Sequence, residues 1–151
     1  MTNQVEQGLT EEMLPLLQKE RYVTIATVDF EKGTPNVNAI SWVYALTLQK
    51  IRFSIDNRSR IIDNIKTNDG VVITLIANGS TYSIAGSARI VTEKMEGVPL
   101  KLALVELEVN EVRDVMFYGA KMMVEPSYEK TYDVEAAAKL DRQVMEALKK
   151  G

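Results

Sequence analysis

Apolar and polar residues alternate along much of this chain, which is the pattern of half-buried β-strands. In residues 21–29, Val23 and Ile25 alternate with small or polar neighbours, and the turn that follows contains Gly33. Comparable runs bounded by turn residues predict further strands over 35–48, 50–56, 71–77, 81–92 and 100–109.

The remaining segments complete a barrel. Beyond a bend at Asn110, residues 113–118 would prolong the last strand and 121–124 would form a seventh. Helical spacing of apolar residues predicts helices over 10–20, 58–68 and 134–150. Six or seven mostly antiparallel strands, joined by short turns and interrupted once by a helix, favour a closed or nearly closed barrel over a sandwich. The sequence therefore predicts one mainly β domain over 1–151, a β-barrel with flanking helices.

Composition limits the chemistry that this domain can perform. The net charge is −3, so there is no general basic surface of the kind that binds nucleic acid. Histidine and cysteine are both absent, which removes the commonest general base, the usual serine-hydrolase triad and nearly every zinc site. We therefore expect no metal site and no nucleic-acid partner, and we expect any chemistry to belong to a bound cofactor. Catalytic residues cannot be named from the sequence.

The chain also lacks the features of exported and membrane proteins. Residues 1–7 carry no cationic flank followed by an apolar run, and nowhere do eighteen apolar residues follow one another. We therefore expect a soluble, cytoplasmic protein without a membrane partner.

The most informative stretch is Asn57-Arg58-Ser59-Arg60, between the strand 50–56 and the helix that follows. Asn57 is a suitable N-cap, and the helix start exposes backbone N–H groups at its positive end. Two guanidinium groups and a hydroxyl stand beside them, so the stretch is suited to hold a phosphate. The alternative, which these residues alone leave open, is that Arg58 and Arg60 are solvated charges on a surface helix.

Several short motifs, in this order, resemble the pyridoxamine 5'-phosphate oxidase-like family of FMN-binding split barrels over about residues 10–125. They are Thr34-Pro35-Asn36-Val37-Asn38-Ala39-Ile40-Ser41-Trp42, Phe53-Ser54, Ser59-Arg60, Asn64-Ile65, Val71-Val72-Ile73 and Ser83-Ile84-Ala85-Gly86-Ser87-Ala88. The resemblance implies a six-stranded antiparallel split barrel that forms a homodimer with FMN at the interface. It also implies that a strand lies along the flavin ring and that a helix start holds the phosphate. The implied cofactor-binding residues are Asn38, Ala39, Ile40, Ser41, Trp42, Ser54, Asn57, Arg58, Ser59 and Arg60, and Arg52 could add a further cation.

Three departures from the family's true oxidases bear on the activity. Ile61 stands where those enzymes carry a lysine, and Asn38 and Val43 stand where they carry basic residues. The histidine that their C-terminal tail brings to the vitamin substrate has no counterpart here. Oxidation of pyridoxine phosphate is therefore not expected.

The leading hypothesis is an FMN-dependent oxidoreductase acting on a small molecule of unknown identity. The alternatives are a non-catalytic module that binds or buffers FMN, and a split barrel that binds a deazaflavin. Haem is disfavoured because the usual histidine and cysteine ligands are missing. For the homodimer, the segments 116–118 and 122–123 offer methionine and aromatic side chains suited to a partner surface, or else to the monomer's own core.

Overall fold

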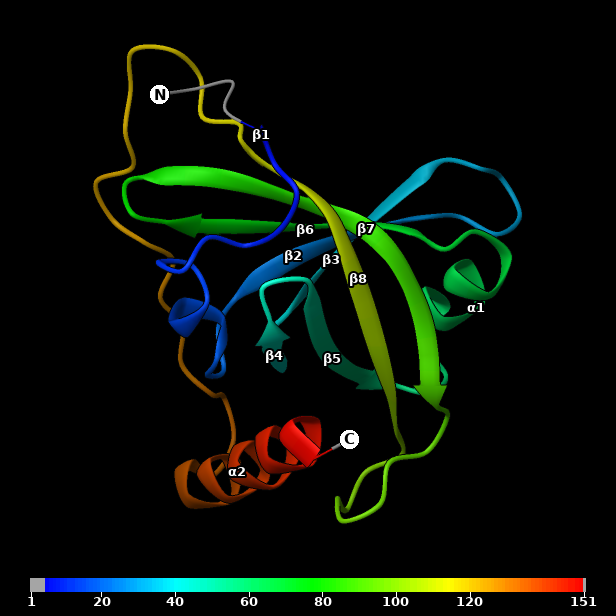
Figure 1. Cartoon of the computed structure of the whole chain (residues 1–151). Coiled ribbons are helices and arrows are strands. Elements are labelled where there is room, and N and C mark those ends of the chain that lie inside the picture. The colour runs from blue at the N-terminus through cyan, green and yellow to red at the C-terminus, as the bar shows by residue number, and fades with distance from the viewer. Residues whose placement is uncertain (1–4, 151) are drawn as a thin grey trace.

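An antiparallel sheet of eight strands forms the body of the protein in the computed structural model, which describes residues 5–150 (Figure 1). Residues 1–4, which belong to the N-terminal stretch considered in the expectation about export, and residue 151 lie outside the described residues. The strands are β1 (Val5–Glu6), β2 (Val23–Val28), β3 (Pro35–Ile40), β4 (Val43–Thr47), β5 (Lys50–Asp56), β6 (Gly70–Ala77), β7 (Ser80–Thr92) and β8 (Leu102–Asp114). The helical elements are η1 (Pro15–Leu17), α1 (Arg60–Thr67) and α2 (Val134–Lys150).

The sheet curls into a barrel that is open along one side. Its strands follow the order β3-β2-β6-β7-β8-β5-β4, with β1 paired to β8. The two end strands, β3 and β4, are joined by Ser41 and Trp42 alone, so the ends of the sheet must lie near each other. The mainly β, antiparallel barrel with flanking helices is thereby confirmed, with more strands than the six expected.

The predicted strand 35–48 is divided into β3 and β4, and the reason lies in its backbone hydrogen bonds. The carbonyl of Ser41 accepts from the backbone N–H groups of both Arg21 and Val43, at 3.0 and 3.1 Å. This bend moves the chain from its β2 partner to its β5 partner.

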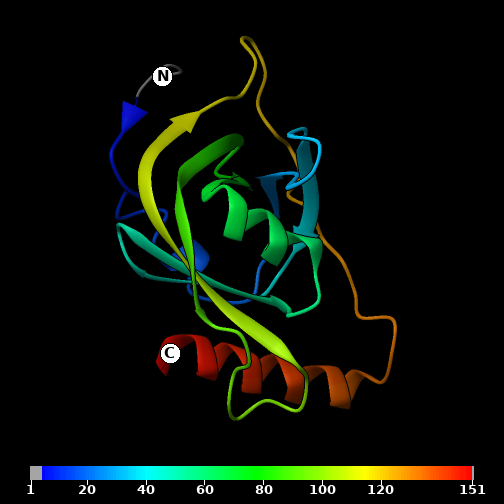
Figure 2. The ribbon, with the colours of Figure 1, turned by 90° about the vertical axis from the view of Figure 1, so that its right-hand side faces the viewer.

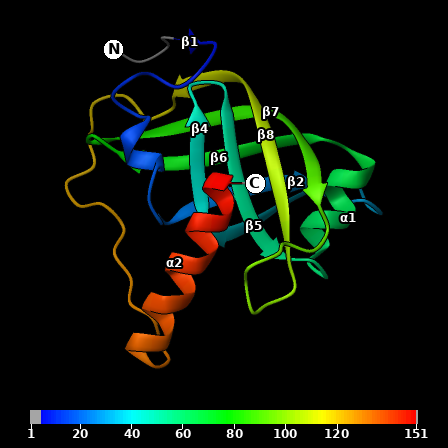
Figure 3. The ribbon, with the colours of Figure 1, turned by 60° about the horizontal axis from the view of Figure 1, so that its bottom comes forward.

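The barrel interior is filled by apolar side chains from alternate strand positions and closed at its two ends. Phe53, Ile73 and Leu107 are fully buried there. The segment with η1 closes one end and α1 closes the other (Figure 1). A second apolar cluster forms outside the barrel, where α2 covers the outer face of β4 and β5 (Figure 3).

Two predicted elements differ from the structure. The helix expected over 10–20 is only the short η1, because Pro15 lacks the N–H that would continue an α-helical ladder and the bonds that follow span three residues. The strand expected over 121–124 is absent from the described residues, where the backbone N–H of Met122 bonds to the carbonyl of Gly79. The expected bend at Asn110 is a β-bulge, since β7 pairs with Val109 and Glu111 and skips Asn110.

Neither α1 nor α2, the helices of the described residues, has the length and apolar character needed to cross a membrane.

Candidate functional site

Helix α1 begins at Arg60 and is capped by Ser59, not by Asn57 as predicted. The Ser59 hydroxyl accepts a hydrogen bond from the backbone N–H of Ile61 at 3.1 Å. Asn57 lies two residues before the cap, and its backbone N–H donates to the carbonyl of Lys101 at 3.0 Å. Its side-chain amide donates to the carbonyl of Glu93 at 2.9 Å. Asn57 therefore anchors the loop that leads to the helix.

Arg60 is held by the turn between β2 and β3. Its Nε donates to Oδ1 of Asp29 at 2.6 Å, and its Nη2 lies 3.4 Å from Oδ2 of Asp29 and 3.0 Å from Oε1 of Glu31. The guanidinium carbon also stands 4.7 Å from the centroid of the Phe30 ring. Two carboxylates and an aromatic face thus fix the direction of a side chain that is still half exposed.

Asp29 is the fixed member of this cluster, with 5% of its surface exposed. Its Oδ2 accepts from the backbone N–H groups of Glu31 and Lys32, at 3.1 and 2.9 Å. The hydrogen bond from Arg60, followed by these backbone bonds, holds the pKa of the Asp29 carboxyl well below its usual value. The hydrogen bonds from Arg60 to Asp29 and then to Glu31 raise the pKa of Arg60 above its ordinary value. Asp29 is therefore an ionised carboxylate that orients Arg60.

Arg58 does not join this cluster. Its guanidinium pairs with Asp56 at 3.3 Å, and 83% of its side chain is exposed. The sequence left open that both arginines are solvated charges on a surface helix. This alternative fits Arg58 but not Arg60, which is held by Asp29.

Asn64 ties α1 to the same turn, and sequence reasoning gave it no role of its own. Its side chain is fully buried; the amide donates to Oγ1 of Thr27 at 2.9 Å and to Oδ1 of Asn36 at 2.8 Å. Its Oδ1 accepts from the backbone N–H of Phe30 at 2.9 Å. Figure 2 shows α1 beside the β2–β3 hairpin that these bonds secure. A polar residue between Asp63 and Ile65 on the buried face of the predicted helix was the signal that could have revealed it.

Strand β3 carries the first group of predicted flavin contacts at the edge of the sheet. Asn38 lies opposite buried Ile25 and so points toward the interior side, yet it is exposed because β3 pairs only with β2 in the described residues. Ala39 lies opposite Thr24 and faces outward, and Ile40 packs against the barrel core. The free edge of β3 presents backbone N–H and C=O groups without a strand partner in residues 5–150.

Ser41 and Trp42 are engaged by a polar network beneath α2. The Ser41 hydroxyl donates to Oε2 of Glu20 at 2.6 Å, and Nε1 of Trp42 donates to Oδ1 of Asp141 at 2.9 Å. Lys130 joins the two carboxylates, at 2.6 Å from Glu20 and 3.0 Å from Asp141. The stretch that follows β3 is thus connected to the C-terminal helix.

Ser54 and Arg52 also lie on the α2 side of the sheet. Ser54 is buried, and its hydroxyl lies 3.2 Å from Sδ of Met95. Arg52 pairs with buried Glu106 at 3.1 Å and donates to the carbonyl of Leu148 at 3.4 Å. The contacts of these two side chains are thus with Met95, Glu106 and Leu148 and not with the start of α1.

The structure therefore separates the predicted residues into three groups. The hydrogen bond between Asn64 and Asn36 connects α1 to the first half of β3, just before the predicted residues 38–40. The groups are 57–60 at the helix start, 38–40 on β3, and Ser41, Trp42 and Ser54 against α2 and its neighbours.

A shallow groove of about 640 Å³ runs across the outer face of β2, β6 and β7, next to β3. It is lined largely by small and apolar side chains, among them Ala26, Val72 and Ala85. Val37, on the same outward side of β3, is 66% exposed. Residues 5–150 thus leave an apolar sheet face uncovered.

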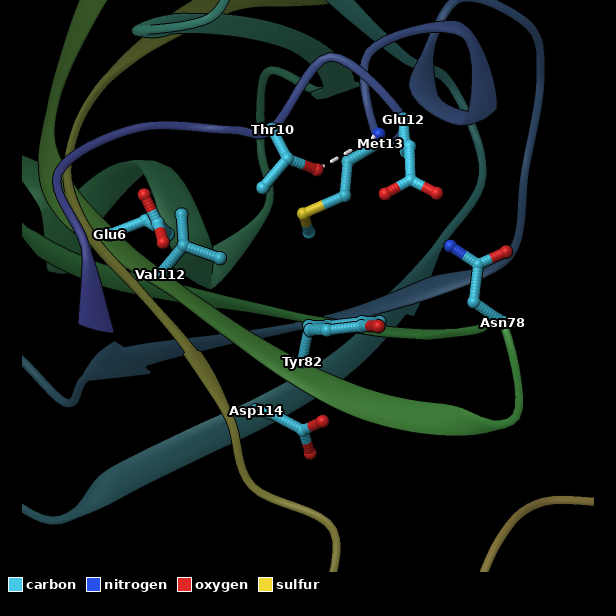
Figure 4. Close-up of a pocket in the computed structure, with 8 residues that line it drawn as sticks. All are labelled: Glu6, Thr10, Glu12, Met13, Asn78, Tyr82, Val112 and Asp114. Carbon is cyan, nitrogen blue, oxygen red and sulfur yellow. Dashed lines mark hydrogen bonds between the residues drawn. The ribbon is translucent and has the colours of Figure 1, made fainter. Parts of the chain in front are cut away.

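A second pocket, of about 300 Å³, lies at the other end of the sheet and has an acidic lining (Figure 4). Glu12 and Asp114 approach Tyr82 there, and burial followed by these two charges raises the pKa of the Tyr82 hydroxyl. No predicted site residue lines this pocket, and its charge is unsuited to an anion. Within residues 5–150, no group of three or more aspartate and glutamate side chains is arranged to hold a metal ion.

Several solved structures share this fold. A candidate pyridoxamine 5'-phosphate oxidase from Lactobacillus delbrueckii is 20% identical with a TM-score of 0.62, over 74% of this chain and 98% of that one. HupZ of Group A Streptococcus is 21% identical with a TM-score of 0.59, over 75% and 98% of the two chains. An F420 reductase is 21% identical with a TM-score of 0.57, over 69% and 98%. Because these sequence identities are low, the structural likeness establishes a shared fold alone.

No curated protein sequence matches the chain significantly. Residues 9–116, however, match the sequence profile of the pyridoxamine 5'-phosphate oxidase family. The match extends from the segment before η1 to the end of β8 and so includes every strand of the sheet except β1. Because it spans well over half of the chain, the protein belongs to the pyridoxamine 5'-phosphate oxidase family.

Proposed function

We propose that the protein is a flavoprotein that binds FMN between the start of α1 and the free edge of β3. In this proposal the bound flavin serves the oxidation or reduction of a small molecule. Family membership supports the proposal, and the observation that carries it is the position of Arg60. Asp29 orients the guanidinium of Arg60 at the positive end of α1. Nη1 of Arg60 makes no hydrogen bond within residues 5–150. That nitrogen is therefore a donor left for an anion.

The side chains at this site offer hydrogen-bond donors for one phosphate group but no excess of positive charge, because carboxylates outnumber cations. The cations are Arg58 and Arg60, and the nearby carboxylates are Asp29, Glu31 and Asp56. A phosphate monoester carries about −1.5 to −2 charges at neutral pH, so it would share Arg60 with carboxylates. We infer that Arg60 and the start of α1, including Ser59, hold the phosphate, and that Arg58 contributes at longer range.

The polar edge of the flavin ring would meet backbone groups along the free edge of β3. Asn38, Ala39 and Ile40 are the residues we propose for this contact, followed by the backbone of Ser41 and Trp42. The side chains of Ser41 and Trp42 are bound to Glu20 and Asp141 and would support the strand. Ser54 would reach a flavin only after Met95 moved away. FMN, when bound, supplies electron or hydride transfer, and the chain supplies its orientation.

We further propose a twofold homodimer with the cofactor near the interface. The uncovered outer face of β2, β6 and β7 supports it, because a partner would bury apolar surface that the single chain leaves open. The segment after β8 adds exposed side chains at Phe117, Tyr118 and Met123, with 71%, 95% and 82% of their surface accessible. It lies against the β6–β7 hairpin through the Met122–Gly79 bond.

A non-catalytic module that binds FMN is the second candidate. The absence of histidine and cysteine from the sequence favours it, because the side chains that most often perform acid–base or nucleophilic steps are missing. The two candidates differ in turnover. Steady-state consumption of NADH or NADPH with an electron acceptor would support the oxidoreductase, and binding without consumption would support the module.

Flavin titrations of the wild type and of Arg60→Lys test the proposed phosphate site. Lysine keeps the charge beside Asp29 but loses the planar fork, so FMN should bind more weakly by about 1–3 kcal/mol, the size of a charge-assisted hydrogen bond. Riboflavin, which has no phosphate, should bind equally well to both proteins. Arg142→Lys, on exposed α2 surface, is the matched control. Equal losses for FMN and riboflavin would place the phosphate elsewhere, and tighter binding of FAD than of FMN would also contradict the proposal.

A further inference from the structure

The turn between β2 and β3 brings two carboxylates to the same guanidinium, and they differ in kind. Asp29 is buried and accepts two backbone hydrogen bonds in addition to its bonds with Arg60. Glu31 has 64% of its side chain exposed and makes one ion pair, from Oε1 to Nη2 of Arg60 at 3.0 Å. Asp29 is therefore part of the framework, whereas Glu31 is a movable side chain held by a single contact.

Glu31 takes up part of the donor capacity that a phosphate would need. Nη2 of Arg60 already serves Asp29 at 3.4 Å and Glu31 at 3.0 Å, and Nε serves Asp29. An anion that bound Nη1 alone would gain one charge-assisted bond, while an anion that displaced Glu31 could use both terminal nitrogens of the fork. A phosphate in either place would also lie near the Glu31 carboxylate and be repelled by it.

We propose that Glu31 is a specificity-determining residue of the cofactor site: it competes with the phosphate of FMN for Arg60 and so reduces the preference for the phosphorylated flavin over riboflavin. The inference rests on the proposed function, since it assigns the phosphate to Arg60. It adds that the chain carries its own anionic competitor at that position. FMN would accordingly bind more weakly, and exchange more readily, than it would at the same site without the Glu31 carboxylate.

Substitution of Glu31 should therefore increase cofactor affinity, a direction that loss of a structural contact would not produce. For Glu31→Gln we expect FMN to bind about three- to tenfold more tightly, which is the range for removing one exposed like charge close to a bound anion. Glu31→Lys should increase the affinity further. Riboflavin affinity should be the same in all three proteins, and added salt should reduce the gain for FMN because exposed charges are screened.

The experiment is a titration of the full-length protein with FMN and, separately, with riboflavin, followed by quenching of flavin fluorescence. Glu146→Gln is the matched control, since it removes a similarly exposed carboxylate, 60% accessible, from α2. Circular dichroism of each variant verifies that the fold is retained.

An FMN affinity that rises in the order wild type, Glu31→Gln, Glu31→Lys, with riboflavin unchanged, supports the proposal. If FMN and riboflavin both bind but Glu31→Gln leaves the FMN affinity unchanged, or changes both flavins alike, the role of Glu31 is wrong while flavin binding stands. If neither flavin binds to any of the proteins, both the role of Glu31 and the proposed function are overturned.

Discussion

Arg60 and Asp29 form an ion pair at 2.6 Å, and the two residues have unequal roles. Asp29 is enclosed by the turn that it organises, so its charge is fixed in place. Arg60 extends from the helix start and keeps half of its side chain in solvent. The buried carboxylate of Asp29 depends on the half-exposed guanidinium of Arg60 for its charge partner. The stability of the protein should therefore be sensitive to acid and to the loss of either residue.

The pair gives the first prediction, which concerns acid stability. Because the pKa of Asp29 is lower in the folded than in the unfolded protein, its contribution to stability is complete above its ordinary pKa of about 4 and is lost as the pH falls below it. The Arg60→Ala variant lacks the hydrogen bond that contributes most to lowering the pKa of Asp29. Its free energy of unfolding should therefore depend less on pH in the same acidic range. Urea unfolding midpoints measured from neutral to acid pH check this. Parallel curves for the two proteins would contradict it.

Asn64 gives a second prediction at the same scale. Its three hydrogen bonds join α1 to β2, β3 and the turn between them, all from a fully buried side chain. Asn64→Ala would leave buried polar partners unsatisfied and should reduce the free energy of unfolding by about 2–4 kcal/mol. Asn68→Ala, an exposed amide just beyond the same helix, should cost far less. Denaturant titrations of the two variants provide the comparison, and equal losses would contradict the account.

At residue scale, sequence reasoning predicted a helix start in the stretch 57–60 but chose the wrong N-cap. Ser59, Arg60 and the helix that follows lie where predicted, because capping residues and apolar spacing act locally. The choice between Asn57 and Ser59 as cap was missed, since it depends on a hydrogen bond to Lys101, which is distant in sequence. The carboxylate partners of Arg60 were missed for the same reason: they reach it only through the fold.

At the scale of elements, α2 matters most for the proposed site. It covers the outer face of β4 and β5, and its Asp141 binds both the indole of Trp42 and the ammonium of Lys130. Trp42 is the only tryptophan of the chain and directly follows the proposed ring-binding strand. The docking of α2 is therefore coupled to the position of this stretch.

Asp141→Ala should loosen that docking. It removes the acceptor for Trp42 and one of the two carboxylates of Lys130, with an expected cost of about 1–3 kcal/mol for partly buried polar contacts. Tryptophan emission should shift to longer wavelength as the indole becomes more solvated. Glu146→Ala on the exposed side of α2 is the control. Unchanged emission in Asp141→Ala would show that Asp141 does not hold the indole.

The positions of most strands along the chain could be predicted from the sequence, because alternation and turn residues are local signals. The short N-terminal η1, the division of the strand 35–48 and the missing strand at 121–124 could not. Each of these depends on which partner a backbone group finds in the folded chain. The helix over 134–150 was predicted with its bounds, but its packing against Trp42 was not visible in the pattern.

At the scale of the whole molecule, the uncovered face of β2, β6 and β7 supports a homodimer, and the fourth prediction tests it. A charge placed on a twofold interface is felt in both protomers, so Val72→Asp or Phe117→Asp should dissociate the dimer. Val134→Asp, at the exposed start of α2, is the control. Light scattering should give twice the 16.9 kDa of one chain for the wild type and the control, and 16.9 kDa for the two interface variants. A monomeric wild type would exclude the interface.

The fold class could be predicted at this scale from the sequence, and the family match extends over strands β2 to β8. The cofactor could be anticipated only through the family resemblance, because Arg60 already pairs with two carboxylates and no local motif distinguishes a phosphate from the chain's own carboxylates.

The central claim, that this barrel binds FMN, is tested most directly by the chromophore of the purified wild-type protein. Its visible spectrum should show oxidised flavin, either as isolated or after incubation with FMN and removal of the excess. Mass spectrometry of the released molecule should identify FMN, with one bound per chain. A protein that retains no FMN after such incubation, or that releases a deazaflavin or haem instead, would contradict the account.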